Sequence, residues 1–137
     1  MKILMLEDEV SSYKHFQRFV RDLRDAHGNA IDLVFVRSIG EFKTRFGKNG
    51  SEYSAVVLDN NLVVLGEKPE RALESGLLEW VREQNPAIPI ACNSIGGDLN
   101  FDPIAFAEKH SVPNFQKSYI AFEQFVADLC KAELCKK

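Results

Sequence analysis

Short apolar runs alternate along the chain with segments whose apolar residues recur every three or four positions, a pattern typical of α/β proteins with a parallel sheet. Two runs are interrupted, IDLVFV (31–36) by Asp32 and SVPNFQ (111–116) by Pro113, and such runs fit the sheet edges. We therefore predict a doubly wound five-stranded parallel sheet in the order 2-1-3-4-5, with helices on both faces. The three central strands are the nearly continuous apolar runs: KILML (Lys2–Leu6), AVVL (Ala55–Leu58) and IPIAC (Ile88–Cys92).

Helical periodicity fills the segments between these runs, most clearly over residues 13–23 and 73–81. The last predicted helix, from residue 118 to about residue 134, carries apolar residues over more than half of its circumference. Packing on one sheet face requires a narrower stripe. Either the whole arc is buried, or a flank marked by Ile120 or Phe125 contacts a partner, for which a homodimer through this helix is one arrangement.

Composition narrows the class of protein. The chain has 137 residues, a net charge of −3 and 45% hydrophobic residues, which fits one globular domain over residues 1–137. The sequence lacks the basic stripe that is typical of nucleic-acid binding. No apolar run has the length of a membrane span or a secretory signal. The three cysteines, Cys92, Cys130 and Cys135, lack metal-ligand spacing and would leave one unpaired, which favours reduced thiols and a cytoplasmic location.

Polar residues follow the predicted strands at their carboxyl ends, which is the edge where open α/β sheets bind ligands. Three acids brought together there repel one another unless a cation neutralises them, and Mg²⁺ prefers such oxygen ligands. The sequence therefore predicts a Mg²⁺ site, with a lysine adding positive charge. In strand order, the polar residues at these ends are Glu7, Asp8 and Glu9, then Asp59, then Asn93 and Ser94, and finally Lys117. The three acids of the predicted Mg²⁺ site are Glu7, Asp8 and Asp59.

These residues, in this order, resemble the receiver domain of two-component response regulators. The resemblance rests on KILMLEDE, VVLDNN, IPIACNS and Lys117 after the fifth run, and it covers essentially the whole chain. It implies that Asp59 accepts a phosphoryl group from a histidine kinase or a phosphotransfer protein. It also implies that the phosphorylated chain signals by binding a downstream effector protein.

The resemblance further implies a role for each remaining candidate. Asp8 would bind Mg²⁺ directly together with Asp59, Glu7 would act through a water, and the main-chain carbonyl of Asn61 would complete the protein ligands. Ser94 and Lys117 would contact the phosphoryl oxygens. Positioning and charge stabilisation of this kind supply most of the catalysis in phosphoryl transfer.

Three departures from the family pattern leave a second interpretation open. The segment 63–74 lengthens the loop after Asp59 by about nine residues relative to the family spacing, and long structured loops are often functional; Gly76 would then open the third helix. Ser118 replaces the proline that usually follows the lysine, and Asn114 stands where many receivers carry an aromatic switch residue. A receiver-fold interaction module that no longer depends on phosphate is the alternative.

Each candidate also has a purely structural alternative. Asp59 fits a turn cap, residues 7–9 fit a solvated charge run, Ser94 fits a turn and Lys117 fits a surface lysine. A phosphatase of the haloacid-dehalogenase type also uses an aspartate after a strand, but its second aspartate would fall at Asn61, whose amide cannot shuttle a proton. We therefore expect a signalling domain that phosphorylates and dephosphorylates only itself, rather than an enzyme.

Overall fold

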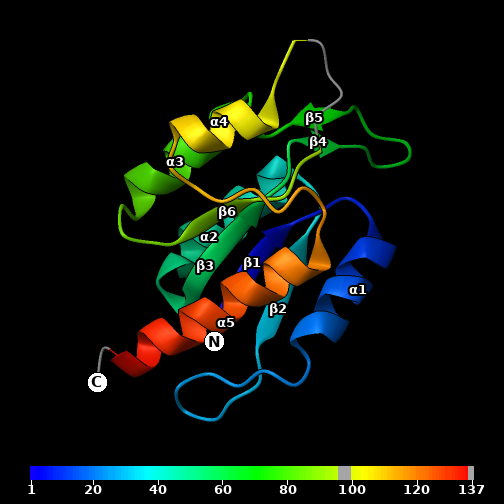
Figure 1. Ribbon diagram of the computed structural model, residues 1–137. Coiled ribbons are helices and arrows are strands. Elements are labelled where there is room, and N and C mark those ends of the chain that lie inside the picture. Colours follow the sequence, from blue (N-terminus) through cyan, green and yellow to red (C-terminus); the bar gives the residue numbers. More distant parts are fainter. Residues whose placement is uncertain (96–99, 136–137) are drawn as a thin grey trace.

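The protein forms a parallel sheet with helices on both faces (Figure 1). The computed structural model describes residues 1–95 and 100–135, with only the backbone of Asn49, Leu134 and Cys135. No helix in the described part is long and apolar enough to cross a membrane. The elements in chain order are β1 (Lys2–Leu6), α1 (Val10–Val20), β2 (Asp32–Val36), α2 (Ile39–Asn49), the 3₁₀ turn η1 (Gly50–Glu52), β3 (Tyr53–Leu58), β4 (Asn61–Leu62), β5 (Glu70–Arg71), α3 (Leu77–Gln84), β6 (Ile90–Cys92), α4 (Pro103–Lys109) and α5 (Tyr119–Cys135).

The sheet has the predicted class and order for its first four strands, β2-β1-β3-β6, all parallel. The predicted fifth strand is wrong as a regular strand, because it is reduced to one parallel bridge between Cys92 and Asn114. The Cys92 N–H donates to the Pro113 carbonyl at 2.8 Å, and its carbonyl accepts from Phe115 at 2.9 Å. Pro113 has no N–H to extend the ladder, and the left-handed backbone at residues 116 and 117 (φ 50° and 64°) ends the extended segment.

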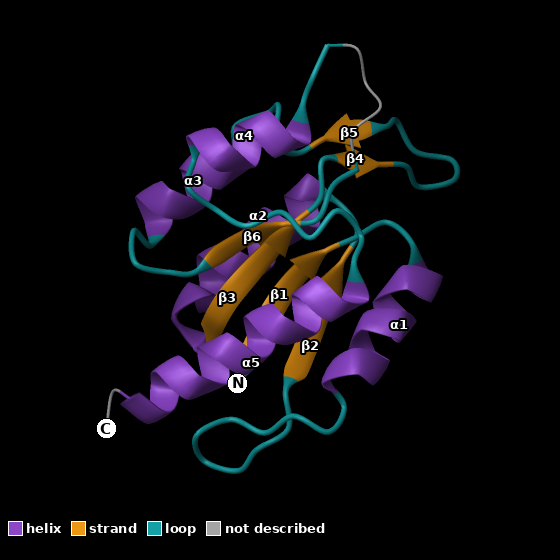
Figure 2. Cartoon of the chain, viewed as in Figure 1, coloured by secondary structure: helices purple, strands orange, loops and turns teal. Residues whose placement is uncertain are grey.

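Two apolar cores lie on opposite faces of the sheet, which divides the fold into three layers (Figure 2). Helices α1 and α5 cover one face with Phe16, Val20, Phe122 and Val126. Helices α2 and α3 cover the other face, and Phe106 of α4 packs at its margin. Both faces of β1 and β3 are therefore covered, which explains their nearly continuous apolar sequences.

Loop residues set where the helices begin. The Ser38 hydroxyl accepts the N–H of Glu41 at 3.1 Å at the start of α2. Asp102 accepts two N–H groups at the start of α4, where Pro103 occupies the first turn. Gly76 precedes α3 with φ 88°, a left-handed conformation that suits glycine. The prediction that Gly76 opens the third helix is confirmed.

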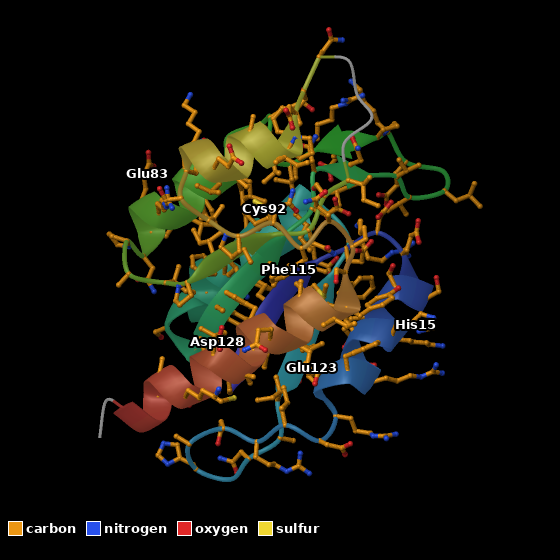
Figure 3. The ribbon with its side chains drawn as sticks, viewed as in Figure 1. His15, Glu83, Cys92, Phe115, Glu123 and Asp128 are labelled. Atoms are coloured by element: carbon orange, nitrogen blue, oxygen red, sulfur yellow. The ribbon has the colours of Figure 1, made fainter. Side chains whose placement is uncertain are left out.

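The wide apolar arc of α5 is mostly buried. The side chain of Phe122 is fully buried, and the ring of Phe115, labelled in Figure 3, meets it edge-on at a centroid distance of 5.7 Å. Phe125 is half-buried and also packs on Phe115, at 5.3 Å. Ile120 is different, since 74% of it is exposed. The two flanks proposed from the sequence are therefore unequal, and Ile120 alone of the pair is free to meet a partner.

A pair of substitutions in α5 tests this division. Ile120→Ser should change the free energy of unfolding by less than about 0.5 kcal/mol, as expected for an exposed position. Phe122→Ala should lower it by about 3–5 kcal/mol, because it leaves a cavity in the α1–α5 core. Chemical denaturation measures both values. Sedimentation of the wild type and of Ile120→Ser tests the homodimer, which is excluded if both variants sediment as monomers.

Candidate functional site

Three carboxylates meet at the carboxyl ends of β1 and β3. These strands pair in parallel with Met5 beside Val57, so the residues two positions further on, Glu7 and Asp59, emerge next to each other. Glu7, Asp8 and Asp59 each bring an oxygen within 4.8 Å of the others. Glu7 and Asp59 are buried and Asp8 is half-exposed. The structure thus brings together the acids that the sequence assigned to one site.

Lys117 reaches this cluster from the segment beside β6. Its Nζ lies 3.0 Å from Glu7 Oε2 and 2.5 Å from Asp59 Oδ2. The peptide bond between Lys117 and Ser118 is trans, and the turn is made by left-handed backbone at Gln116 and Lys117. The lysine therefore reaches the acids without the proline turn that the family pattern uses at this place.

Burial has the largest effect on the pKa values of the two buried acids. It raises the pKa of Glu7 to about 7, although the Lys117 ammonium acts in the opposite direction. Burial also raises the pKa of Asp59, again against the effect of Lys117. Burial alone would lower the pKa of Lys117, but the charges of Asp59 and Glu7 outweigh it and raise that pKa. The Lys117 ammonium contacts two of the three carboxyl groups, and the Arg37 guanidinium donates to the main-chain carbonyl of Asp8 at 3.2 Å, so the acids outnumber the cations beside them.

The donor set of the acidic cluster fits a hard divalent cation such as Mg²⁺, because it offers only oxygens at close range. Each acid is also held in place. Glu7 Oε1 accepts the N–H of Glu9 at 3.2 Å, and Asp8 Oδ2 accepts the N–H of Val63 at 2.9 Å. Asn61 lies at the exposed start of β4, two residues after Asp59, and its carbonyl remains a predicted ligand.

The Ser94 hydroxyl is hydrogen-bonded to the carboxylate of Asp59. It donates to Asp59 Oδ1 at 2.9 Å and accepts the N–H of Asn60, also at 2.9 Å. The same N–H lies 2.8 Å from Asp59 Oδ1. Asp59 is therefore held on one oxygen by Ser94 and Asn60 and on the other by Lys117.

The long loop after Asp59 is an antiparallel hairpin of β4 and β5, anchored by a buried asparagine that the sequence reasoning missed. The Asn60 amide oxygen accepts from Leu73 and Glu74 at 2.9 and 3.2 Å, and its Nδ2 donates to the Glu74 carboxylate at 3.0 Å. The pair of amides after Asp59 was the available signal, but only the second, Asn61, was assigned a role. Glu70 of β5 accepts the N–H of Ile39 at 3.0 Å, which ties the hairpin to α2.

Comparison with known proteins supports the fold. No protein-family model matches the chain, and no curated protein matches its sequence. A response regulator receiver domain protein from Clostridium thermocellum is similar in structure, with a TM-score of 0.67 at 13% identity over 99% of this chain and 98% of that one. A CheY-like receiver domain protein from Methanospirillum hungatei gives 0.66 at 11% identity over 99% and 98% of the two chains. The signal receiver domain of a LuxO repressor protein from Vibrio parahaemolyticus gives 0.64 at 15% identity over 98% and 93%. The chain therefore has the receiver-domain fold.

Charge-removing substitutions test the metal site. Asp8→Asn should weaken Mg²⁺ binding more than Glu7→Gln, because Asp8 is half-exposed whereas Glu7 is already paired with Lys117. Glu9→Gln, the same change at an exposed neighbour, should leave the affinity unchanged. Isothermal titration calorimetry measures the affinities. Equal Mg²⁺ affinity in the wild type and in Asp8→Asn would exclude this site.

The loop anchor makes a separate prediction. Asn60→Ala should lower the free energy of unfolding by about 1–3 kcal/mol, because it leaves the N–H groups of Leu73 and Glu74 without their acceptor. Amide hydrogen exchange at these two residues should accelerate. Asn61→Ala is the matched control, since it removes the same group at an exposed position. Unchanged exchange in Asn60→Ala would show that the hairpin is held by other contacts.

Proposed function

We propose that the chain is a phosphoryl-accepting receiver in which Asp59 takes a phosphoryl group from a histidine kinase or a phosphotransfer protein. The observation that carries the proposal is the surroundings of the Asp59 carboxylate. It lies at the end of a central strand of the receiver fold, among the Ser94 hydroxyl, the Lys117 ammonium and the acids Glu7 and Asp8. These groups match what phosphoryl transfer to a carboxylate requires.

In the proposed reaction, a carboxylate oxygen of Asp59 forms a bond to phosphorus while the bond from phosphorus to the imidazole nitrogen of the donor phosphohistidine breaks. The leaving imidazole takes up a proton from solvent. The Lys117 ammonium and the Ser94 hydroxyl, which contact the two Asp59 oxygens, move onto phosphoryl oxygens. A Mg²⁺ ion bound by Glu7, Asp8 and Asp59 would supply further stabilisation of the developing charge.

Exposed apolar residues around the site support a function in protein binding. Ile95 follows Ser94, Ile120 lies three residues after Lys117, and the N–H of Val63 is bonded to Asp8. Val10 is exposed at the start of α1, two residues after Asp8. Scattered apolar residues are normal on a surface, but a group bordering one site suits a protein partner. We propose that a kinase or phosphotransfer protein docks here in the cytoplasm, and that a downstream effector reads the phosphorylated surface.

Labelling with a small phosphoryl donor tests the function. With Mg²⁺ and acetyl phosphate, intact mass spectrometry should detect one phosphoryl adduct that hydroxylamine removes. Asp59→Asn should abolish the adduct and keep the fold, because the amide is nearly isosteric but is not a competent nucleophile. Asp22→Asn, at a side chain that is 90% exposed, should be labelled like the wild type.

Two outcomes would contradict the proposal. Labelling of Asp59→Asn at the wild-type rate would remove Asp59 from the acceptor role. A wild type that takes no label, with the donor active on another receiver, would favour the interaction module that works without phosphate. In that module the ion pairs of Lys117 with Glu7 and Asp59 would be the permanent state of the site.

A further inference from the structure

Two asparagines hold the backbone of the segments that carry Lys117 and Ser94. Asn93 comes directly after β6 and is 1% exposed. Asn114 lies in the neighbouring segment, at the single bridge to Cys92. Both side chains bond main-chain groups of the site residues, so each bears on the chemistry through the residue that it holds.

Asn93 fixes the backbone of Lys117. Its Oδ1 accepts the Lys117 N–H at 2.8 Å, where the Lys117 backbone is left-handed (φ 64°). A residue other than glycine adopts this conformation at a cost, and it persists where surrounding contacts hold it. The Nδ2 of Asn93 is buried without a hydrogen-bond partner in the described ranges 1–95 and 100–135. A buried donor without a partner is unfavourable, and an apolar side chain at this position would avoid that cost. Within the described ranges, the only hydrogen bond of the Asn93 side chain is the one that its oxygen accepts from Lys117.

Asn114 fixes the backbone of Ser94 in both directions. Its Oδ1 accepts the Ser94 N–H at 3.0 Å, and its Nδ2 donates to the Ser94 carbonyl at 3.1 Å. The same Oδ1 accepts the N–H of Gln116 at 3.1 Å, the other left-handed residue of the turn. One amide thus joins the end of β6 to the turn that leads into Lys117.

We propose that Asn93 and Asn114 are positioning residues for phosphoryl transfer, an inference that rests on the proposed function. Asn93 fixes the turn that directs the Lys117 ammonium at Asp59, and Asn114 fixes Ser94 so that its hydroxyl lies on Asp59 before any phosphoryl group arrives. The aromatic position of the family is occupied by one of these two asparagines.

The rate of labelling by acetyl phosphate tests the proposal. Asn93→Leu, which keeps the branching and the number of heavy atoms of the side chain, and Asn114→Ala should each slow labelling about ten- to a hundred-fold, the effect of misplacing a catalytic group by about 1 Å. The affinity for Mg²⁺ should not fall, because the acids are untouched and a displaced Lys117 ammonium no longer competes with the ion for Glu7 and Asp59. Asn85→Ala is the matched control, since it deletes an amide that accepts a backbone N–H, that of Ala87, outside the site. It should be labelled like the wild type.

A double-mutant cycle separates positioning from general damage to the fold. If Asn93 acts through Lys117, then Asn93→Leu should slow labelling by less than twofold in a Lys117→Ala background. Asn114→Ala should slow labelling less in a Ser94→Ala background than in the wild type, and what remains is the effect of its bond to Gln116. Equal slowing with and without the partner residue, or single variants labelled at the wild-type rate, would overturn the proposal.

Crystal structures of the variants give a readout that needs no phosphorylation. In Asn93→Leu, or in Asn93→Ala if the first does not fold, Lys117 Nζ should leave its 3.0 Å contact with Glu7 Oε2. A lysine that stays in place would overturn the positioning role even if the wild type is labelled. The opposite combination is also informative. If Lys117 moves in the variant but the wild-type protein takes no label, the proposed function is contradicted, whereas the role of Asn93 in positioning Lys117 is supported.

Discussion

The ammonium of Lys117 between Glu7 and Asp59 is the interaction on which the candidate site depends. The parallel pairing of β1 and β3 places two buried carboxylates side by side, and a buried carboxylate without a partner is costly. The side chain of Lys117 is 28% exposed, so it crosses from the surface into the buried cluster. The pairing of β1 and β3 makes Glu7 and Asp59 repel each other, and the Lys117 ammonium relieves part of this repulsion. Because Asp8 adds a third carboxyl group, the carboxyl ends of these strands still suit a divalent cation.

Asparagine side chains support the irregular backbone around this ion-pair cluster. Asn60 holds the return of the hairpin at Leu73, Asn93 holds Lys117, and Asn114 holds Ser94. Backbone groups in loops lack the ladders that satisfy strands and helices, and an amide can donate and accept at once. The departures from the family pattern fall in these loops, where local hydrogen bonds can replace one another. The central strands offer no such freedom, because covered faces demand apolar residues at every position.

The features predicted correctly are those that leave a local pattern along the chain, such as an apolar run that ends in an acid. The class of fold, the order of the four regular strands and the meeting of Glu7, Asp8 and Asp59 all follow from apolar runs and the acids that end them. The fifth strand was overestimated, since an alternating pattern does not reveal the left-handed residues 116 and 117 that end it. The anchoring role of Asn60 could not be predicted, because its partners lie 13 and 14 residues away across a hairpin whose register no local pattern specifies.

The hydrogen bonds that lead outward from the acids indicate where a change at Asp59 can reach the surface. One path runs through Asn60. Its N–H donates to Asp59 Oδ1, and its side-chain oxygen accepts the N–H of Leu73, just after β5 of the hairpin. Asp8 adds a second link to the same hairpin through the N–H of Val63. A third runs through Ser94 to Ile95, which is 58% exposed. The sheet beneath is closely packed on both faces and cannot follow such a change, whereas these segments lie at the surface. These hydrogen bonds therefore join Asp59 and Asp8 to the hairpin and to the end of β6, where Val63 and Ile95 are exposed.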